Sequence, residues 1–294
     1  MDTAYILPEG FTDFDMYTFG CALVVEGLSG FLLNFLSILS FLSIKGLRTP
    51  NNFVLFNLAV ADISLSANGL FAAYASFLRY WPYGPEGCQA HAFHGMVAVL
   101  ASISFLGVVA WDRYHEYCTR QKLPWATAVT VVVIIWLLAV FWSVLPLKGW
   151  GEYDFEPLKT CCTLDYSKGG WNYITYMLSL ATLFFVIPAI TMHSSYQSIY
   201  NQFKRTRKYK FNTNLPLMAL MLCWGPYVLL CMFAVVKNVN LLSPKLRMVL
   251  ALLGKTSPVF HFFLYAFGSE SYRAGIWQLL TGEMISVSET EKKK

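Results

Sequence analysis

Seven long apolar runs constrain the fold of this chain more than any other feature of its sequence. They lie near residues 19–42, 53–78, 89–111, 125–147, 172–200, 213–236 and 246–267. A helix of roughly 20 apolar residues is long enough to cross the hydrocarbon core of a bilayer. Within lipid, only helices and closed barrels satisfy all their backbone hydrogen bonds. The pattern therefore predicts an all-α membrane protein, a seven-transmembrane helix bundle that forms one domain over residues 1–294, with a short tail from about residue 268.

Composition excludes two broad classes of function. Hydrophobic residues make up 56% of the chain and charged residues only 13%, whereas soluble domains contain about 25% charged residues. A soluble enzyme is therefore excluded. The net charge of +5 is small and confined to a few loops, so the sequence gives no support for nucleic-acid binding.

Basic residues concentrate in alternate loops, which predicts the orientation in the membrane. They follow the first, third and fifth runs: Lys45 and Arg48; Arg120 and Lys122; Lys204, Arg205, Arg207, Lys208 and Lys210. Loops rich in Lys and Arg stay in the cytoplasm. The first segment is acidic, so we expect an extracellular or lumenal amino terminus, a cytoplasmic tail and no cleavable signal peptide.

The cysteines leave one pairing open. In this topology Cys88 and Cys162 both lie on the oxidising side of the membrane, where a disulfide can form. The adjacent Cys161 leaves the choice of partner ambiguous. A zinc site needs a second cluster of Cys or His ligands, which this pattern lacks, so we expect no metal.

Lys255 lies near the middle of the last apolar run and has no acidic residue within ten positions on either side. An unpaired ammonium there costs at least about 2.5 kcal/mol. Three explanations are open: burial keeps the amine neutral, an acid such as Asp62 or Glu26 pairs with it, or the amine is converted chemically.

Several motifs occur along the chain in a characteristic order: GFLLN (Gly30 to Asn34), NLAVAD (Asn57 to Asp62), Cys88, DRY (Asp112 to Tyr114), Trp136, Pro188, Tyr196 and CWGPY (Cys223 to Tyr227). This order resembles the rhodopsin-like receptor family. Lys255, ten residues before Tyr265, narrows the resemblance to the opsins. The loop GWGEYDFEPLKTCCTLDYSKG and the unusual last run make the chain similar to the retinochrome-like opsin subfamily.

This resemblance implies that Lys255 forms a Schiff base with all-trans-retinal, which light converts to 11-cis-retinal for chromophore regeneration in the visual cycle. Retinal, as the covalently bound cofactor, and membrane lipid are the expected partners, with a retinoid carrier protein or a retinol dehydrogenase receiving the product. Intracellular membranes of retinal pigment epithelium or Müller cells are the implied location. Whether this light-driven photoisomerase counts as an enzyme stays open.

The resemblance also assigns roles to the residues around the lysine. Visual pigments carry a glutamate three residues after the disulfide cysteine, and His91 stands there. Glu156, six residues before Cys162, matches the outer-loop counterion of many non-visual opsins, although Glu152 and Asp154 are equally acidic. His91 is expected to share a proton with Glu156 or the imine. Trp224 and Tyr227 match the aromatic residues that pack against retinal, and Cys88 and Cys162 the conserved disulfide.

A light-activated G protein-coupled receptor is the main alternative. Asp112, Arg113 and Tyr114 keep the triplet that contacts G proteins in the family. The last run, however, has His261 to Tyr265 (HFFLY) in place of NPxxY, and its proline moves to Pro258. A receptor for a diffusible ligand, with Lys255 in an ion pair, is a third reading. G-protein coupling stays open.

Overall fold

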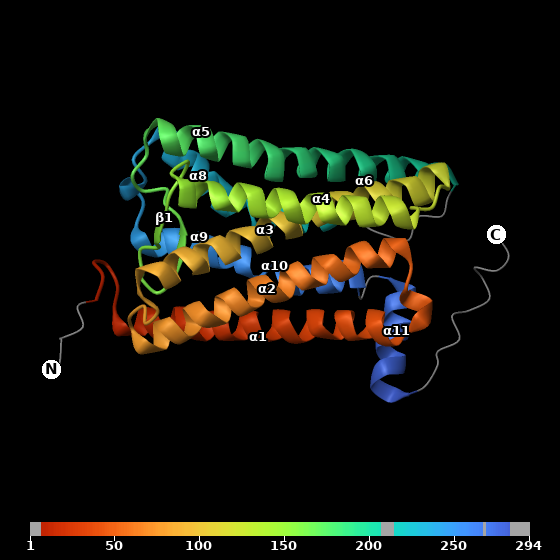
Figure 1. Ribbon diagram of the computed structural model, residues 1–294, viewed down its shortest axis with the longest axis horizontal. Helices are drawn as coiled ribbons and strands as arrows, with labels where there is room; N and C mark the ends of the chain where they lie inside the picture. The colour runs from red at the N-terminus through yellow and green to blue at the C-terminus, as the bar shows by residue number, and fades with distance from the viewer. Residues whose placement is uncertain (1–6, 207–214, 267–268, 283–294) are drawn as a thin grey trace.

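Long helices run side by side along one axis in the computed structural model, which describes residues 7–206, 215–266 and 269–282 (Figure 1). The helices are α1 (Asp13–Ser43), α2 (Pro50–Leu78), α3 (Gly84–Tyr114), α4 (Trp125–Val144), α5 (Gly170–Ala181), α6 (Ile187–Thr206), α7 (Leu215–Cys223), α8 (Gly225–Val236), α9 (Pro244–Lys255), α10 (Ser257–His261) and α11 (Glu270–Thr281). Arg207, Lys208 and Lys210 lie outside the described residues.

The predicted seven spans are confirmed. Six continuous helical segments are long and apolar enough to cross a membrane, and α7 and α8 together form a seventh. Two of the spans contain a π-helical turn. η4 (Thr182–Val186) connects α5 to α6, and η6 (Phe262–Ala266) continues from α10. A third π-helical turn, η2 (His115–Thr119), ends the span of α3.

The bend between α7 and α8 measures 48°. It falls at Trp224, immediately before Gly225 and Pro226. Proline has no backbone N–H and its ring clashes with the preceding turn, so it interrupts the helix. The bend therefore follows directly from the CWGPY sequence, and it brings Trp224 to the junction of the two helices.

Polar caps extend several helices beyond the apolar runs. Thr12 and Asp15 form a capping box at the start of α1, Thr49 caps α2 ahead of Pro50, and Ser243 caps α9 ahead of Pro244. Such caps satisfy N–H groups that have no partner inside the helix. For this reason α1 begins at Asp13, six residues before the apolar run that predicted it.

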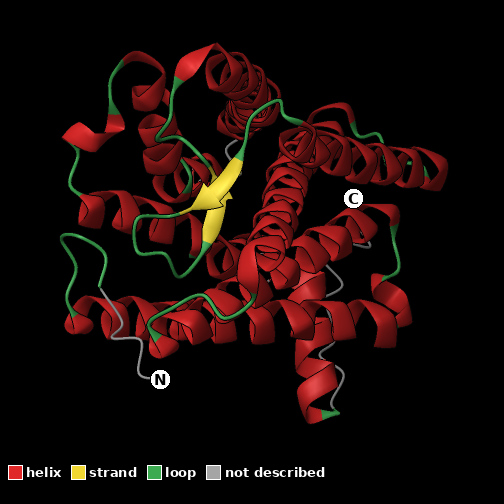
Figure 2. Cartoon of the chain, turned by 60° about the vertical axis from the view of Figure 1, so that its left-hand side comes forward, coloured by secondary structure: helices red, strands yellow, loops and turns green. Residues whose placement is uncertain are grey.

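A short antiparallel hairpin lies across one end of the bundle (Figure 2). Its strands are β1 (Tyr153–Phe155) and β2 (Cys162–Leu164), with Tyr153 opposite Leu164 and Phe155 opposite Cys162. A disulfide joins Cys88 at the start of α3 to Cys162 in the hairpin, and Cys161 is a buried free thiol. The pairing that the sequence left ambiguous is therefore Cys88 with Cys162.

The first two helices approach each other closely because glycines of α1 face α2. A Cβ atom on Gly27 would lie 2.7 Å from Leu70 Cδ2, and one on Gly30 would lie 2.5 Å from Ser66 Oγ. Small residues at helix contacts are typical of membrane bundles, where packing drives association. Asn34 on the same helix donates to the Pro258 carbonyl at 3.0 Å, so α1 also binds the last span.

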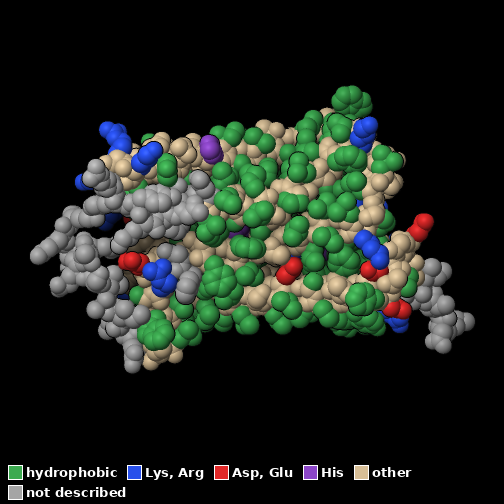
Figure 3. Space-filling view, turned by 180° about the vertical axis from the view of Figure 1, so that it is seen from behind, with side chains coloured by type: hydrophobic (Ala, Val, Ile, Leu, Met, Phe, Trp, Pro, Cys, Tyr) green, Lys and Arg blue, Asp and Glu red, His purple; other side chains and the backbone are tan. Residues whose placement is uncertain are grey.

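The outer surface fits a lipid environment. Apolar side chains cover most of the face in Figure 3, and most visible charged side chains gather toward the two ends. Leu137, Leu222 and Leu229 are each at least 65% exposed. A large apolar surface of this kind marks contact with a membrane or another protein.

The α11 helix crosses the end of the bundle opposite the hairpin (Figure 1). Its buried side chains Tyr272 and Ile276 pack with Leu47 and Phe262. The apolar pattern predicted only a tail here, because α11 buries one side and is too short to give a strong signal. Ser286, Ser288 and Thr290, the phosphorylation candidates in the sequence, lie outside the described residues.

The disulfide should stabilise the fold substantially, because it closes a loop with a sequence separation of 74 residues. We predict that the double variant Cys88→Ser/Cys162→Ser loses about 2–4 kcal/mol of stability. The expected result is a lower midpoint of thermal unfolding for the purified protein in detergent. Cys118→Ser, which removes a free thiol at the other end of the bundle, is the control and should unfold like the unmodified protein.

Candidate functional site

A cavity of about 80 Å³ lies beneath the hairpin, between α2, α3, α8 and α9. Lys255 lines it together with three of the residues to which the resemblance assigned a role around the lysine: Glu156, Trp224 and Tyr227. The other lining residues are Leu65, Asn68, Ala92, Gly95, Met96, Val99, Cys161, Cys162, Thr163 and Ala251. We call this space the lysine cavity. Its lining is largely apolar, with one amine and one carboxyl group.

Lys255 is the last residue of α9. The preceding residue, Gly254, allows close packing, because a Cβ atom there would lie 2.8 Å from Trp224 Cζ3. The Trp224 indole therefore rests against the backbone next to the lysine. Lys255 is only partly buried, and none of the ion pairs among the described residues includes it.

Glu156 comes from the turn that connects β1 and β2, and its side chain is only 3% exposed. Its Oε2 atom accepts a hydrogen bond from the Tyr166 hydroxyl at 2.7 Å. Burial raises the pKa of the Glu156 carboxyl, while the Tyr166 hydrogen bond and the charges of Lys255 and Arg247 act in the opposite direction. Glu156 is thus a buried acid held in a fixed orientation.

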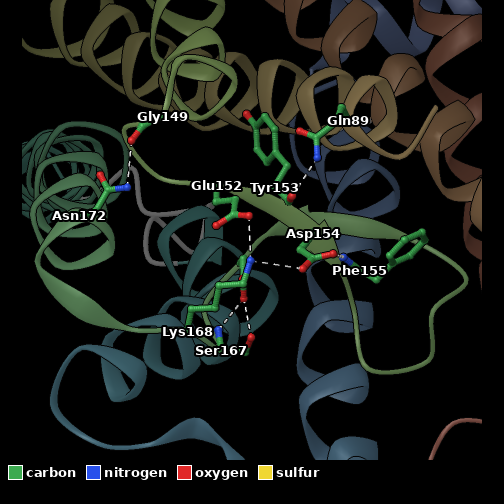
Figure 4. Close-up of polar contacts among 10 residues, drawn as sticks. Gln89, Gly149, Glu152, Tyr153, Asp154, Phe155, Ser167, Lys168 and Asn172 are labelled. Carbon is green, nitrogen blue, oxygen red and sulfur yellow. Dashed lines mark hydrogen bonds and ion pairs between the residues drawn. The ribbon is translucent and has the colours of Figure 1, made fainter. Parts of the chain in front are cut away.

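The two neighbouring acids that the sequence could not separate from Glu156 lie elsewhere. Lys168 Nζ lies 2.7 Å from Glu152 Oε1 and 3.7 Å from Asp154 Oδ2, and both carboxyl side chains are about half exposed. Figure 4 shows Lys168 beside both carboxyl groups on the hairpin. Glu156 is therefore the acid of this loop that combines burial with a place in the lysine cavity.

His91 is buried beside the lysine cavity and is absent from its lining. Its Nε2 atom lies 3.2 Å from the Asn68 carbonyl oxygen, and its Nδ1 atom accepts from the Cys162 N–H at 3.4 Å and lies 3.2 Å from the Cys162 carbonyl oxygen. Among the described residues its hydrogen bonds do not include Glu156. The imidazole connects the disulfide-bonded strand to α2, which is a structural position.

Tyr227 lines the lysine cavity and contacts the hairpin. The Tyr227 hydroxyl lies 3.1 Å from Thr163 Oγ1 on β2. Its ring lies edge-on to those of Trp224 and Tyr166, with centroids 6.4 Å away in each case. Sequence reasoning did not single out Tyr166 or Thr163. Their roles depend on contacts between distant segments, for which the chain carries no local signal.

A second polar cluster lies deeper in the bundle. Asp62 accepts from Ser102 Oγ at 2.8 Å, and its Oδ2 lies 3.0 Å from His261 Nδ1. Both members of this pair are almost fully buried. The Asp62 carboxylate therefore interacts with His261, which removes it as the ion-pair partner of Lys255. Asp62, like Asn34 with its hydrogen bond to the Pro258 carbonyl, thus connects the last span to an earlier helix.

The DRY residues end α3 at the opposite end from the hairpin. Asp112 is 5% exposed, and the Arg113 guanidinium lies 5.1 Å from the centroid of the Tyr265 ring. A cation over an aromatic face is held by cation–π attraction. Arg113 therefore contacts the last residue of the altered HFFLY segment.

A model of the seven-transmembrane receptors of the rhodopsin family matches residues 33–265. The chain belongs to this family. RPE-retinal G protein-coupled receptors are similar to it over 94% of both chains, with 47% identity for the protein of Bos taurus and 46% for that of Homo sapiens. The crystal structure of squid rhodopsin shares the fold, with a TM-score of 0.84 at 22% identity over 96% of this chain and 91% of that one. The protein is therefore a multi-pass membrane protein.

Because burial raises the pKa of Glu156, its carboxyl group should remain protonated above the pH range of ordinary glutamates in the ligand-free protein. Removing the Tyr166 hydroxyl removes a hydrogen bond that lowers this pKa, so Tyr166→Phe should shift the titration to still higher pH. The titration of Glu156 is measured in the unmodified protein and in Tyr166→Phe by infrared difference spectra. The C=O band of the protonated carboxyl group is assigned by its loss in Glu156→Gln. Glu152→Gln is the control and should leave the band in place. A Tyr166→Phe titration at the original pH would contradict the prediction.

Proposed function

We propose that this chain is a retinal-binding opsin that attaches all-trans-retinal to Lys255 and converts it to the 11-cis isomer in the light. The observation that carries the proposal is that Lys255, Glu156 and two aromatic residues line one cavity in a rhodopsin-family receptor. The relatives with 46–47% identity are named RPE-retinal G protein-coupled receptors. The retinochrome-like features of the sequence give the direction of the conversion.

The donor set of the cavity suits retinal. An aldehyde needs a nucleophilic amine, and Lys255 has no ion-pair partner among the described residues. A long apolar polyene needs apolar and aromatic walls, which Leu65, Val99 and Trp224 provide. The cavity volume of about 80 Å³ is below the roughly 300 Å³ typical of ligand pockets. Side chains around it must therefore move when the ligand binds.

Retinal would supply light absorption and the double bond that rotates. The protein supplies the other requirements. Lys255 holds the ligand, Glu156 balances a positive charge at the Lys255 nitrogen, and Tyr166 orients the Glu156 carboxylate through the 2.7 Å hydrogen bond. Trp224 and Tyr227, which pack edge-on, confine the polyene. In this proposal His91 acts indirectly, because it fixes the strand that follows Glu156.

The orientation in the membrane follows from the same assignment. We infer that the hairpin end faces the extracellular space or a lumen, because its disulfide forms in an oxidising compartment. The DRY end and α11 then face the cytoplasm, where Lys45 and Arg48 also lie. Intracellular membranes of retinal pigment epithelium or Müller cells are the proposed site, with a retinoid carrier protein or a retinol dehydrogenase as the partner that receives the product.

Light-activated signalling is the second candidate, because Asp112, Arg113 and Tyr114 are retained. The buried Asp62–His261 pair argues against it. It joins the second span to the seventh within the segment where the family has NPxxY, and breaking it would leave buried polar groups without a hydrogen-bond partner, which is costly. Movement of the seventh span is therefore more restricted than it would be without this pair.

One experiment separates these functions. The purified protein is incubated with all-trans-retinal and reduced with borohydride, and the adduct is located by mass spectrometry; a parallel sample is illuminated and its retinal isomers are extracted. We expect the adduct at Lys255 and mainly 11-cis-retinal after illumination. Lys255→Ala should abolish both, whereas Lys159→Ala should abolish neither. A predominantly all-trans product together with stimulated nucleotide exchange on a G protein would favour signalling, and an adduct elsewhere would end the proposal.

The role of Glu156 has its own test. Removing the carboxylate destabilises the protonated linkage at Lys255, so we predict that Glu156→Gln loses its visible absorption band at a lower pH than the unmodified protein. Absorption spectra recorded across a pH series measure the shift. Asp154→Asn, which alters an exposed acid two residues away, is the matched control. Equal curves for Glu156→Gln and the unmodified protein would transfer the counterion role to another acid, such as Glu26.

A further inference from the structure

A second cavity, of about 440 Å³, lies on the other side of the hairpin turn. We call it the vestibule. Its lining is rich in polar and charged groups, including Asp154, Lys159, Asp165 and Arg247. Asp154 is about half exposed, which places the vestibule next to solvent. It therefore differs from the largely apolar lysine cavity in chemistry as well as in position.

The two cavities share a wall. Glu156 and Thr163 line both of them. Each of these residues is hydrogen-bonded to a residue that lines only one of the cavities. Glu156 accepts from Tyr166, which lines the vestibule, at 2.7 Å. The Thr163 hydroxyl lies 3.1 Å from that of Tyr227, which lines the lysine cavity. A single layer of side chains thus separates the polar space from the space that holds Lys255.

Arg247 indicates what fills the vestibule. Its side chain lines this cavity and is only 8% exposed. Its Nε–H group is buried without a hydrogen-bond partner in the described part of the chain. The guanidinium donates through Nη1 to Asn240 Oδ1 over a long distance of 3.4 Å. Buried polar groups of this kind are commonly satisfied by water when the space is polar and large enough. The vestibule meets both conditions.

The chemistry at Lys255 requires water. Releasing an aldehyde from its protonated linkage to the lysine consumes one water molecule. The water oxygen ends on the aldehyde carbon, the carbon–nitrogen bond breaks, and both water protons end on the nitrogen, which already carries one proton and leaves as an ammonium. Attachment is the reverse and expels one water molecule. A linkage at Lys255 persists only if the lysine cavity is otherwise dry. Water must therefore enter the cavity at a defined place.

We propose that the vestibule is the route by which water enters and leaves the lysine cavity, through the wall formed by Glu156 and Thr163. In this arrangement Glu156 also accepts a proton from the attacking water and passes it to the Lys255 nitrogen. The carboxyl group suits that task because it faces both spaces. The inference rests on the proposed function for its chemistry, although the route itself is a property of the ligand-free protein.

The route can be tested without retinal. Formaldehyde with a borane reductant methylates accessible amines, and mass spectrometry gives the rate at Lys255 relative to the exposed Lys237 in the same sample. Thr163→Ala thins the wall and should raise the relative rate several-fold. Thr163→Leu fills the wall and should lower it, and Thr163→Val separates the loss of the hydroxyl from the change in size. Val99→Ala enlarges the lysine cavity away from the wall and is the matched control.

The same variants are then loaded with all-trans-retinal and exposed to hydroxylamine in the dark. Loss of the visible band should follow the same order, fastest in Thr163→Ala and slowest in Thr163→Leu. Rates that do not depend on residue 163 in either assay would overturn the route and indicate access from the lipid. Equal acceleration by Val99→Ala would overturn the assignment of the wall. If methylation follows the expected order but no adduct forms with retinal, the route stands and the proposed function fails.

Discussion

The cost of placing charge inside a bilayer-spanning bundle governs this structure. Lys255 lies in a membrane-spanning segment, where a charged amine costs at least about 2.5 kcal/mol. In the proposed function the hairpin reduces this cost for the ligand-bound protein, because it carries Glu156 below the surface of the protein. A loop can hold a carboxyl group there only if the loop itself is fixed. The Cys88–Cys162 disulfide, the His91 contacts and the Tyr153 hydroxyl, which donates to the Ser143 carbonyl at 2.8 Å, provide this fixation.

Two of the buried acids, Asp62 and Glu156, are stabilised in different ways. Asp62 is satisfied completely inside the protein, by Ser102 and His261. Glu156 accepts one hydrogen bond from Tyr166 and otherwise faces two cavities. The first arrangement makes a rigid connection between spans, whereas the second leaves a carboxyl group available for a ligand. This division suits the proposed function, in which the chemistry occurs beside the hairpin.

Much of the fold was predictable because its causes are local. Hydropathy predicts the seven spans, and Pro226 predicts the bend in the sixth. The starts of α1 and α2 were placed too late, because Thr12 and Thr49 act through caps rather than through apolarity. Family motifs led to Lys255, Glu156, Trp224 and Tyr227, which the structure places in one cavity. The position of His91 outside its lining was not foreseeable from a spacing that matches a glutamate in visual pigments.

The remaining parts of the site depend on contacts between distant segments. Tyr166 lies ten residues from Glu156 along the chain, and Arg247 lies in the last span. The sequence alone therefore does not indicate that either residue lies beside Glu156. Together with Thr163 they explain how one loop serves two opposing needs. A linkage at Lys255 needs a dry environment to persist, and its release needs water. In the proposed route, a wall one side chain thick meets both needs, because a small movement of Glu156 or Thr163 would change access without opening the bundle. The disulfide anchors Cys162 beside Thr163, so the fixation that positions Glu156 would also limit how far this wall moves.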